Sequence, residues 1–261
     1  GEQITDKGYG NGTSMIIFAG LISSLPTTIS EIYQDRFVNI DSSRMTESII
    51  FVSILAVAVL AIVYFTTYVQ QAEYKIPIQY TKRAQGAPSS SYLPLKLNPA
   101  GVIPVIFAGS ITAIPTSILQ SYSWLTALQE FFDYTTVKGM IVYALLIILF
   151  TFFYTFVQVN PEKTAENLQK SGAYIHGVRP GKGTEAYFSK LLMRLAAVGA
   201  LFLGFVALLP ILAQNLLGLS SNIAFLGTSL IIIIMTSIEG IKQLEGFLLK
   251  RKYVGFMDIT E

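Results

Sequence analysis

The 261-residue chain carries charge on only 13% of its residues, against roughly 25% in an ordinary soluble domain, and 52% of its residues are hydrophobic. Its mean hydropathy is +0.55. It contains no cysteine and one histidine, which excludes a disulfide framework and a thiolate metal site. The composition predicts a membrane protein, because long apolar runs have to be shielded from water or face lipid.

Six segments are expected to cross the membrane, since a helix needs about 20 apolar residues to span a hydrocarbon core of about 30 Å. In chain order the expected spans are 13–33, 48–69, 100–119, 140–159, 195–217 and 223–238. The first is the weakest, because Ser23, Ser24 and Pro26 interrupt it, and by itself it could be a buried helix of a soluble protein.

Prolines inside the expected spans predict kinks, because each removes a backbone hydrogen bond. They are Pro26, Pro104, Pro115 and Pro210. The span 100–119 has two of them together with two glycines, and this pattern favours a helix that can bend. Glycine and proline are also common in membrane helices for packing alone, so that alternative stays open.

Positive charge is concentrated on one side of the expected membrane domain. Fifteen of the 18 Lys and Arg residues lie at the N-terminus, in the loops 70–99 and 160–194, or in the tail 239–261. Because Lys and Arg favour the cytoplasmic side, we expect one transmembrane domain, residues 1–261, with both termini and both long loops in the cytoplasm. The chain opens on Gly1 rather than on methionine, as a fragment or processed piece would.

The expected spans contain almost no group that could carry out chemistry. Ion-coupled carriers place ionisable residues inside the membrane, whereas here Glu239, with Lys242 one helical turn on, lies only at the end of the last span. No HExxH or GxSxG pattern is present, so neither a metal nor a nucleophile for hydrolysis is visible. We therefore expect no enzymatic activity, no cofactor and no metal.

The stretch GVRPGKGT, residues 177–184, contains a Gly-Lys pair, as a phosphate-binding loop does. Such a loop also needs glycine five residues before that pair and serine or threonine directly after it. His176 and Gly183 occupy those positions, so nucleotide binding is not expected. The roles of Arg179 and Lys182 must come from their surroundings.

Several motifs resemble the bacterial SecY family, the channel subunit of the Sec protein translocon. They are GEQITDKGYGNGTSMIIFAGLISSLP (1–26), YTKRAQG (80–86), LPLKLNPAGVIPVIFAGS (93–110), GAYIHGVRPGKGT (172–184) and GTSLIIIIMTSIE (227–239). Their order and loop lengths agree with a family of ten spans in two inverted halves, of which this chain resembles spans five to ten. The resemblance implies an all-α membrane protein: a polytopic bundle of six transmembrane helices, part of a ten-helix inverted-repeat channel.

The resemblance implies an apolar constriction midway through the channel, contributed by three spans. By motif its residues are Ile17, Leu21, Ile106 and Ile232, and Leu21 departs mildly from the isoleucine usual in the family. Such a ring can exclude ions by disfavouring water and can close around a passing polypeptide. The periodicity alone does not distinguish these four residues from neighbouring apolar ones.

The resemblance also implies a lateral gate, through which a signal sequence or a nascent membrane helix leaves for lipid. The spans 100–119 and 140–159 would form one side of it, with Asn98 at a polar gate position. An asparagine directly before proline is also a good helix start, and that interpretation explains the residue equally well.

The two long loops would dock the motor ATPase SecA or the ribosome. In the second loop the contact residues would be Arg179 and Lys182, in a turn shaped by glycine and proline. In the first loop they would be Lys82 and Arg83. The tip of that first loop, residues 84–92, lacks the arginines that many family members carry.

As a whole, the resemblance implies the central channel subunit of the general secretory translocon in the bacterial cell membrane. It would conduct unfolded preproteins across the membrane and release transmembrane segments laterally into lipid. The implied partners are SecE, SecG, SecA, the ribosome, preprotein signal sequences, the lipid bilayer and the N-terminal half of the same channel, but not DNA. A polytopic solute carrier is the alternative, disfavoured by the uncharged spans, and a structural scaffold subunit is a third interpretation.

Overall fold

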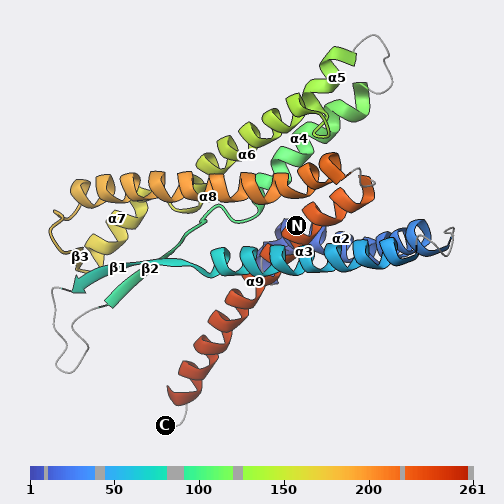
Figure 1. The fold of residues 1–261 in the computed structure, drawn as a ribbon. Helices are drawn as coiled ribbons and strands as arrows, with labels where there is room; N and C mark the ends of the chain where they lie inside the picture. Colours follow the sequence, from blue (N-terminus) through green and yellow to red (C-terminus); the bar gives the residue numbers. More distant parts are fainter. Residues whose placement is uncertain (9–10, 39–44, 81–90, 120–125, 218–220, 258–261) are drawn as a thin grey trace. The chain divides into compact units, whose positions relative to one another are not determined.

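The computed structural model describes residues 1–8, 11–38, 45–80, 91–119, 126–217 and 221–257 (Figure 1). Most of these residues are helical. The helices are α1 (Glu2–Lys7), α2 (Gly12–Tyr33), the π-helical turn η1 (Gln34–Val38), α3 (Met45–Gln71), α4 (Ile103–Leu119), α5 (Thr126–Phe132), α6 (Val137–Gln158), α7 (Pro161–Lys170), α8 (Lys182–Leu217) and α9 (Ser221–Met257). The strands are β1 (Glu73–Tyr80), β2 (Ser91–Lys96) and β3 (Ala173–Ile175).

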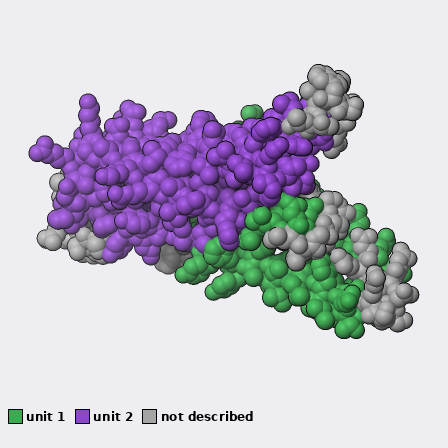
Figure 2. Space-filling model, turned by 45° about the horizontal axis from the view of Figure 1, so that its top comes forward, with its two compact units in different colours: residues 1–68, 209–261 green, residues 69–208 purple. Residues whose placement is uncertain are grey.

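The chain divides into two compact units (Figure 2). Unit 1 comprises residues 1–68 and 209–261, and unit 2 comprises residues 69–208. The second boundary in the sequence falls inside α8, between Leu208 and Leu209, one residue before Pro210. Each unit has its own internal packing, which the following paragraphs describe.

In unit 1, α2 packs against α9 and begins with a side-chain cap. The Asn11 side-chain oxygen accepts hydrogen bonds from the backbone N–H groups of Thr13 and Ser14, at 3.1 and 3.4 Å, which satisfies donors that a helix start leaves free. Further along α2, the hydroxyls of Ser24 and Thr28 donate to carbonyl oxygens of the preceding turn. Ser24, one of the residues that weaken the first expected span, is therefore satisfied within the helix itself.

In unit 2, α4 packs against α6, and the short α5 contacts both helices at one end of the pair (Figure 1). The buried face of α6 repeats every four residues and includes Tyr143, Ile147, Thr151 and Thr155. The hydroxyls of Thr151 and Thr155 donate to carbonyl oxygens one turn back, at 2.6 and 2.7 Å. Two threonines can thus be buried between helices without an unpaired donor.

Unit 2 also contains a three-stranded antiparallel sheet in the order β2-β1-β3, which the sequence had not led us to expect. In the register, Ile76 lies opposite Leu93, and Tyr80 lies opposite Ala173. Pro77 is tolerated in the middle strand because β3 pairs with β1 only from Ile78 onward, so Pro77 has a single neighbouring strand.

One face of this sheet carries a small hydrophobic core beneath α7 and the first turns of α8. The buried residues are Ile76, Ile78, Leu95, Leu168, Ala173, Ile175, Phe188 and Leu195. α7 is fixed at its start by Asn160, whose side chain accepts a hydrogen bond from the Lys163 N–H, and by Pro161 in its first turn. The two expected long loops, 70–99 and 160–194, therefore share one packed substructure.

Four segments of the described chain are long and apolar enough to cross a membrane: Gly12–Tyr33, Met45–Gln71, Val137–Lys170 and Lys182–Asn215. α4 is apolar but shorter, with 17 residues. The expected span 223–238 lies in α9, where the side chains of residues 221–228 fall outside the described part. The helix continues to Met257, well into the segment expected to be a tail.

The expectation that Pro104 kinks a span is wrong. α4 begins at Ile103, so Pro104 lies in the first turn, where its missing N–H would have had no helical partner. Pro26, Pro115 and Pro210 lie inside α2, α4 and α8 respectively, as the sequence predicted.

Candidate functional site

The GVRPGKGT stretch forms a compact connection between β3 and α8. The Val178 N–H donates to the Ile175 carbonyl oxygen at 3.1 Å. Gly177, the third residue of that turn, has φ of +79°, whereas no described residue other than glycine has positive φ. The turn is therefore of type II, which requires a residue such as glycine at this position. Gly181 has φ of +83° and completes the second bend of the loop.

The start of α8 holds this loop in place. The buried Thr184 hydroxyl donates to the carbonyl oxygen of Arg179 at 3.1 Å, and the Glu185 N–H donates to the Gly181 carbonyl oxygen at 3.1 Å. The side chains of Arg179 and Lys182 are exposed, and the ion pairs of the described chain involve neither. The loop thus presents two free cations on a hydrogen-bonded backbone.

Pairing between β1 and β3 brings the two long loops together. β1 belongs to the loop 70–99 and β3 to the loop 160–194, and they pair from Ile78 to Tyr80. Lys82 and Arg83, two and three residues beyond the end of β1, lie outside the described residues. The sequence contained no signal for this pairing, because the partners are 93 to 97 residues apart and β3 has only three residues.

Asn98 lies in a tight turn before α4. Its side chain is 2% exposed, and its Nδ2 donates to the Gly101 carbonyl oxygen at 3.0 Å. Gly101 has φ of +65°. α4 begins five residues after Asn98, so the asparagine closes a turn and does not cap the helix.

The same turn packs closely on α8. A Cβ added to Gly199 would lie 3.3 Å from the Asn98 Oδ1 and 3.6 Å from the Leu97 carbonyl oxygen, so a small residue is needed there. The Asn98 Oδ1 is buried and accepts no hydrogen bond within the part of the chain that the structure describes. Because buried polar atoms in proteins are hydrogen-bonded, we expect a donor from another segment to reach the Asn98 Oδ1.

The predicted constriction residues lie in both units. Ile17 and Leu21 are one turn apart on α2 and therefore share a face. Ile232 is on α9, which packs against α2, and these three residues are half-buried in unit 1. Ile106 is half-buried on α4 in unit 2. The ring of four stays a prediction.

The helix that carries Ile106 has three different faces, at about 100° of rotation per residue. The buried face comprises Pro104, Val105, Ala108, Thr112 and Leu119. One exposed face is strongly apolar and comprises Phe107, Ile111, Ile114 and Ile118. The other comprises the half-buried Ile106 and the exposed Ser110, Ala113 and Ser117. This last row, with its small and hydroxyl side chains, could have been found from helical spacing in the sequence but was overlooked.

Residues 1–241 match the family model described as SecY. The chain belongs to the SecY family. Its relatives include the protein translocase subunit SecY of Streptococcus sanguinis, 70% identical over 268 residues, and that of Bacillus subtilis, 46% identical over 267 residues. These matches cover 100% and 98% of this chain, but only 62% and 61% of the relatives. The chain therefore spans about three fifths of their length, in agreement with the expected part of a longer channel.

Two solved structures share the fold of this SecY-family chain. One is described as a protein conducting channel and has a TM-score of 0.56 at 16% identity, covering 93% of this chain and 60% of that one. The other, a study of the plug domain of SecY, has the same TM-score and covers 93% of this chain and 61% of that one. Together with the candidate spans, this likeness confirms the predicted fold class, a polytopic helical membrane protein. The count of six spans stays a prediction.

Proposed function

We propose that this chain forms the larger part of the central channel subunit of a protein translocon, which conducts unfolded preproteins and releases transmembrane segments into lipid. The observation that carries the proposal is the 70% identity to a protein translocase subunit along the whole chain. The spans support a conduit rather than an ion-coupled carrier, because they lack the ionisable groups that such a carrier needs. The driving force would come from a partner.

The pathway through the channel would pass the apolar residues Ile17, Leu21, Ile106 and Ile232. Branched apolar side chains disfavour water at a narrow point, so the resting channel would resist ions. The row of Ser110, Ala113 and Ser117 on the same face as Ile106 supports this assignment, since small hydroxyl side chains suit a hydrated wall. Their hydroxyl lone pairs remain able to accept hydrogen bonds from water.

The lateral gate would use α4 and α6, with Asn98 at the entrance of α4. The unpaired Asn98 Oδ1 supports the assignment, because it can accept a hydrogen bond from a helix that closes against α4. Opening of the gate would exchange that donor for water or for a polar group of the substrate.

The GVRPGKGT loop would dock a cytoplasmic partner, either the SecA motor or the ribosome. Arg179 presents a planar guanidinium that can bind a carboxylate or a phosphate through two hydrogen bonds. Lys182, Lys82 and Arg83 would add positive charge. SecE, SecG and the N-terminal half of the channel would complete the assembly in a bacterial cell membrane, with both termini of this chain in the cytoplasm.

The conduit is tested by Ile232→Asn in the complete channel, reconstituted in planar bilayers and in liposomes. We expect resting ion conductance to rise, because a polar side chain hydrates the constriction. Ile233→Asn is the matched control, since Ile233 is also half-buried but points about 100° away on the same helix. An equal leak in both variants, or in neither, would remove Ile232 from the pathway.

The translocation activity itself is tested in the same liposomes with the unmodified channel. Uptake of a preprotein that depends on SecA and ATP is the expected result. Counterflow of small solutes without preprotein uptake would instead identify a solute carrier.

A further inference from the structure

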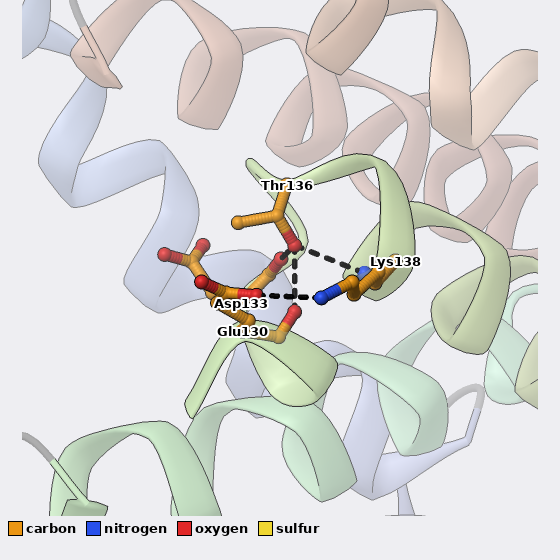
Figure 3. Close-up of polar contacts among 5 residues, drawn as sticks. Glu130, Asp133, Thr136 and Lys138 are labelled. Carbon is orange, nitrogen blue, oxygen red and sulfur yellow. Dashed lines mark hydrogen bonds and ion pairs between the residues drawn. The ribbon is translucent and has the colours of Figure 1, made fainter. Parts of the chain in front are cut away.

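The connection between α5 and α6 is closed by a dense polar network (Figure 3). The Thr136 hydroxyl lies 2.6 Å from the Glu130 carbonyl oxygen and 2.9 Å from that of Asp133, and it accepts a hydrogen bond from the Gly139 N–H at 3.0 Å. The Asp133 carboxylate accepts from the Thr135 N–H and hydroxyl, at 2.9 and 2.7 Å. The polar groups named here, where the chain reverses, are therefore hydrogen-bonded to one another within residues 130–139.

Two further contacts hold α5 against the start of α6. The Lys138 ammonium lies 2.8 Å from a Glu130 carboxylate oxygen and 5.7 Å from the centre of the Phe131 ring. A Cβ on Gly139 would collide with the carbonyl oxygen of Asp133, so the close approach requires glycine. The hairpin is therefore a preorganised element.

This preorganised hairpin exposes apolar side chains in spite of its polar interior. Leu128 and Phe131 are each 49% exposed on α5, and Val137 is 69% exposed at the start of α6. Gln129 lies on the other side of α5, with Glu130. A seven-residue helix with one apolar and one polar face is typical of a boundary between water and an apolar phase.

The exposed apolar surface continues directly along α6. Val137, Ile141, Leu145, Leu149, Phe153 and Val157 recur every four residues and are all 57–69% exposed. α6 belongs to a segment apolar and long enough to cross a membrane. Its neighbour α4 has 17 residues and so extends about 25 Å, slightly less than a hydrocarbon core of about 30 Å. We therefore expect α5, which precedes α6 in the chain, to lie at the edge of the lipid.

We propose that α5 is an interfacial anchor, which lies at the boundary between the hydrocarbon core and the headgroups and inserts Leu128 and Phe131 into the lipid. The continuity with the apolar row of α6 makes lipid the expected partner, because α6 belongs to a segment that is long and apolar enough to cross a membrane. Glu130 and Lys138 lie toward the headgroups, where their mutual pairing reduces the cost of placing charge near lipid. The anchor fixes the depth of α4 and α6, and it does not depend on what passes through the channel.

The anchor is tested by spin labelling of the complete channel in liposomes. Single cysteines replace Leu128 or Gln129 in a background without other cysteines, and each carries a nitroxide. Collision with oxygen, which concentrates in lipid, is compared with collision with a water-soluble nickel chelate. We expect the ratio of oxygen to nickel collisions to be several-fold higher for Leu128→Cys than for Gln129→Cys, and higher still for Ile141→Cys on α6.

Two results would overturn the anchor. Equal, high nickel collision at Leu128→Cys and Gln129→Cys would place both faces of α5 in water. Low collision with both reagents at Leu128→Cys would show that protein covers the apolar face. If Leu128→Cys does not assemble, Val137→Cys reports the same boundary, because Val137 is 69% exposed and lies at the start of α6.

Discussion

Arg179 lies between two glycines whose backbone conformation few other residues adopt. Gly177 and Gly181 have φ of +79° and +83°, a region that costs most L-residues roughly 1 kcal/mol or more. The carbonyl oxygen of Arg179 is further held by the Thr184 hydroxyl. The loop thus restricts the backbone at Arg179. This lowers the conformational entropy that the arginine loses when a partner binds it.

At this scale we expect Arg179→Glu to reduce SecA-driven export by the complete channel several-fold, because it repels acidic groups on the partner. Lys163→Glu is the control, since Lys163 is an exposed cation on α7 with the same charge change. Export is measured in inverted membrane vesicles, and assembly is checked by copurification of the subunits. If both variants lose the same activity, the arginine contributes only bulk charge.

Among the elements, α4 shows how one helix can serve three environments. Its buried face packs against α6. A second, apolar face carries Phe107, Ile111, Ile114 and Ile118. The third face has small and hydroxyl side chains beside Ile106. The Ser110 and Ser117 hydroxyls donate to carbonyl oxygens one turn back, at 2.9 and 2.8 Å. Such bonds satisfy the donors, so the helix can turn this face toward lipid or water at little cost.

Cysteine labelling distinguishes the two exposed faces of α4. In the complete channel, we expect Ser110→Cys and Ser117→Cys to react with a charged thiol reagent much faster than Ile111→Cys and Ile118→Cys. Only the thiolate reacts, and a thiol that faces lipid stays protonated and out of reach of the reagent. Labelling rates are followed by a mass-tagged maleimide chase. Equal rates on the two faces would contradict a hydrated wall.

For the whole molecule, the sheet constrains the topology in a way that charge counts do not. β1 and β3 can pair only if the loops 70–99 and 160–194 are on the same side of the membrane, so an even number of crossings must separate them. The two expected crossings between them are α4 and α6. Ten of the 18 Lys and Arg residues lie in these two loops, and this concentration of positive charge favours the cytoplasm.

Orientation is tested with single cysteines at exposed positions and a maleimide that does not cross membranes. Met45→Cys and Glu130→Cys should react in right-side-out vesicles, whereas Lys163→Cys and Lys182→Cys should react only after the vesicles are opened. All four positions are exposed in the structure, so access depends on the side of the membrane. The reverse pattern would place the docking loop outside the cell and would overturn its proposed partners.

The sequence by itself determined the membrane class, four candidate spans and the family, because hydropathy and motif identity are properties of local stretches. It also identified the glycine and proline framing of Arg179, since turn chemistry is local. Only the tertiary structure decided that Tyr80 pairs with Ala173, that Asn98 packs on Gly199, and that α5 folds back on α6. These contacts join residues that are distant in the chain or depend on one missing Cβ. The strand pairing forms because buried side chains such as Phe188 and Ile76 pack into one core.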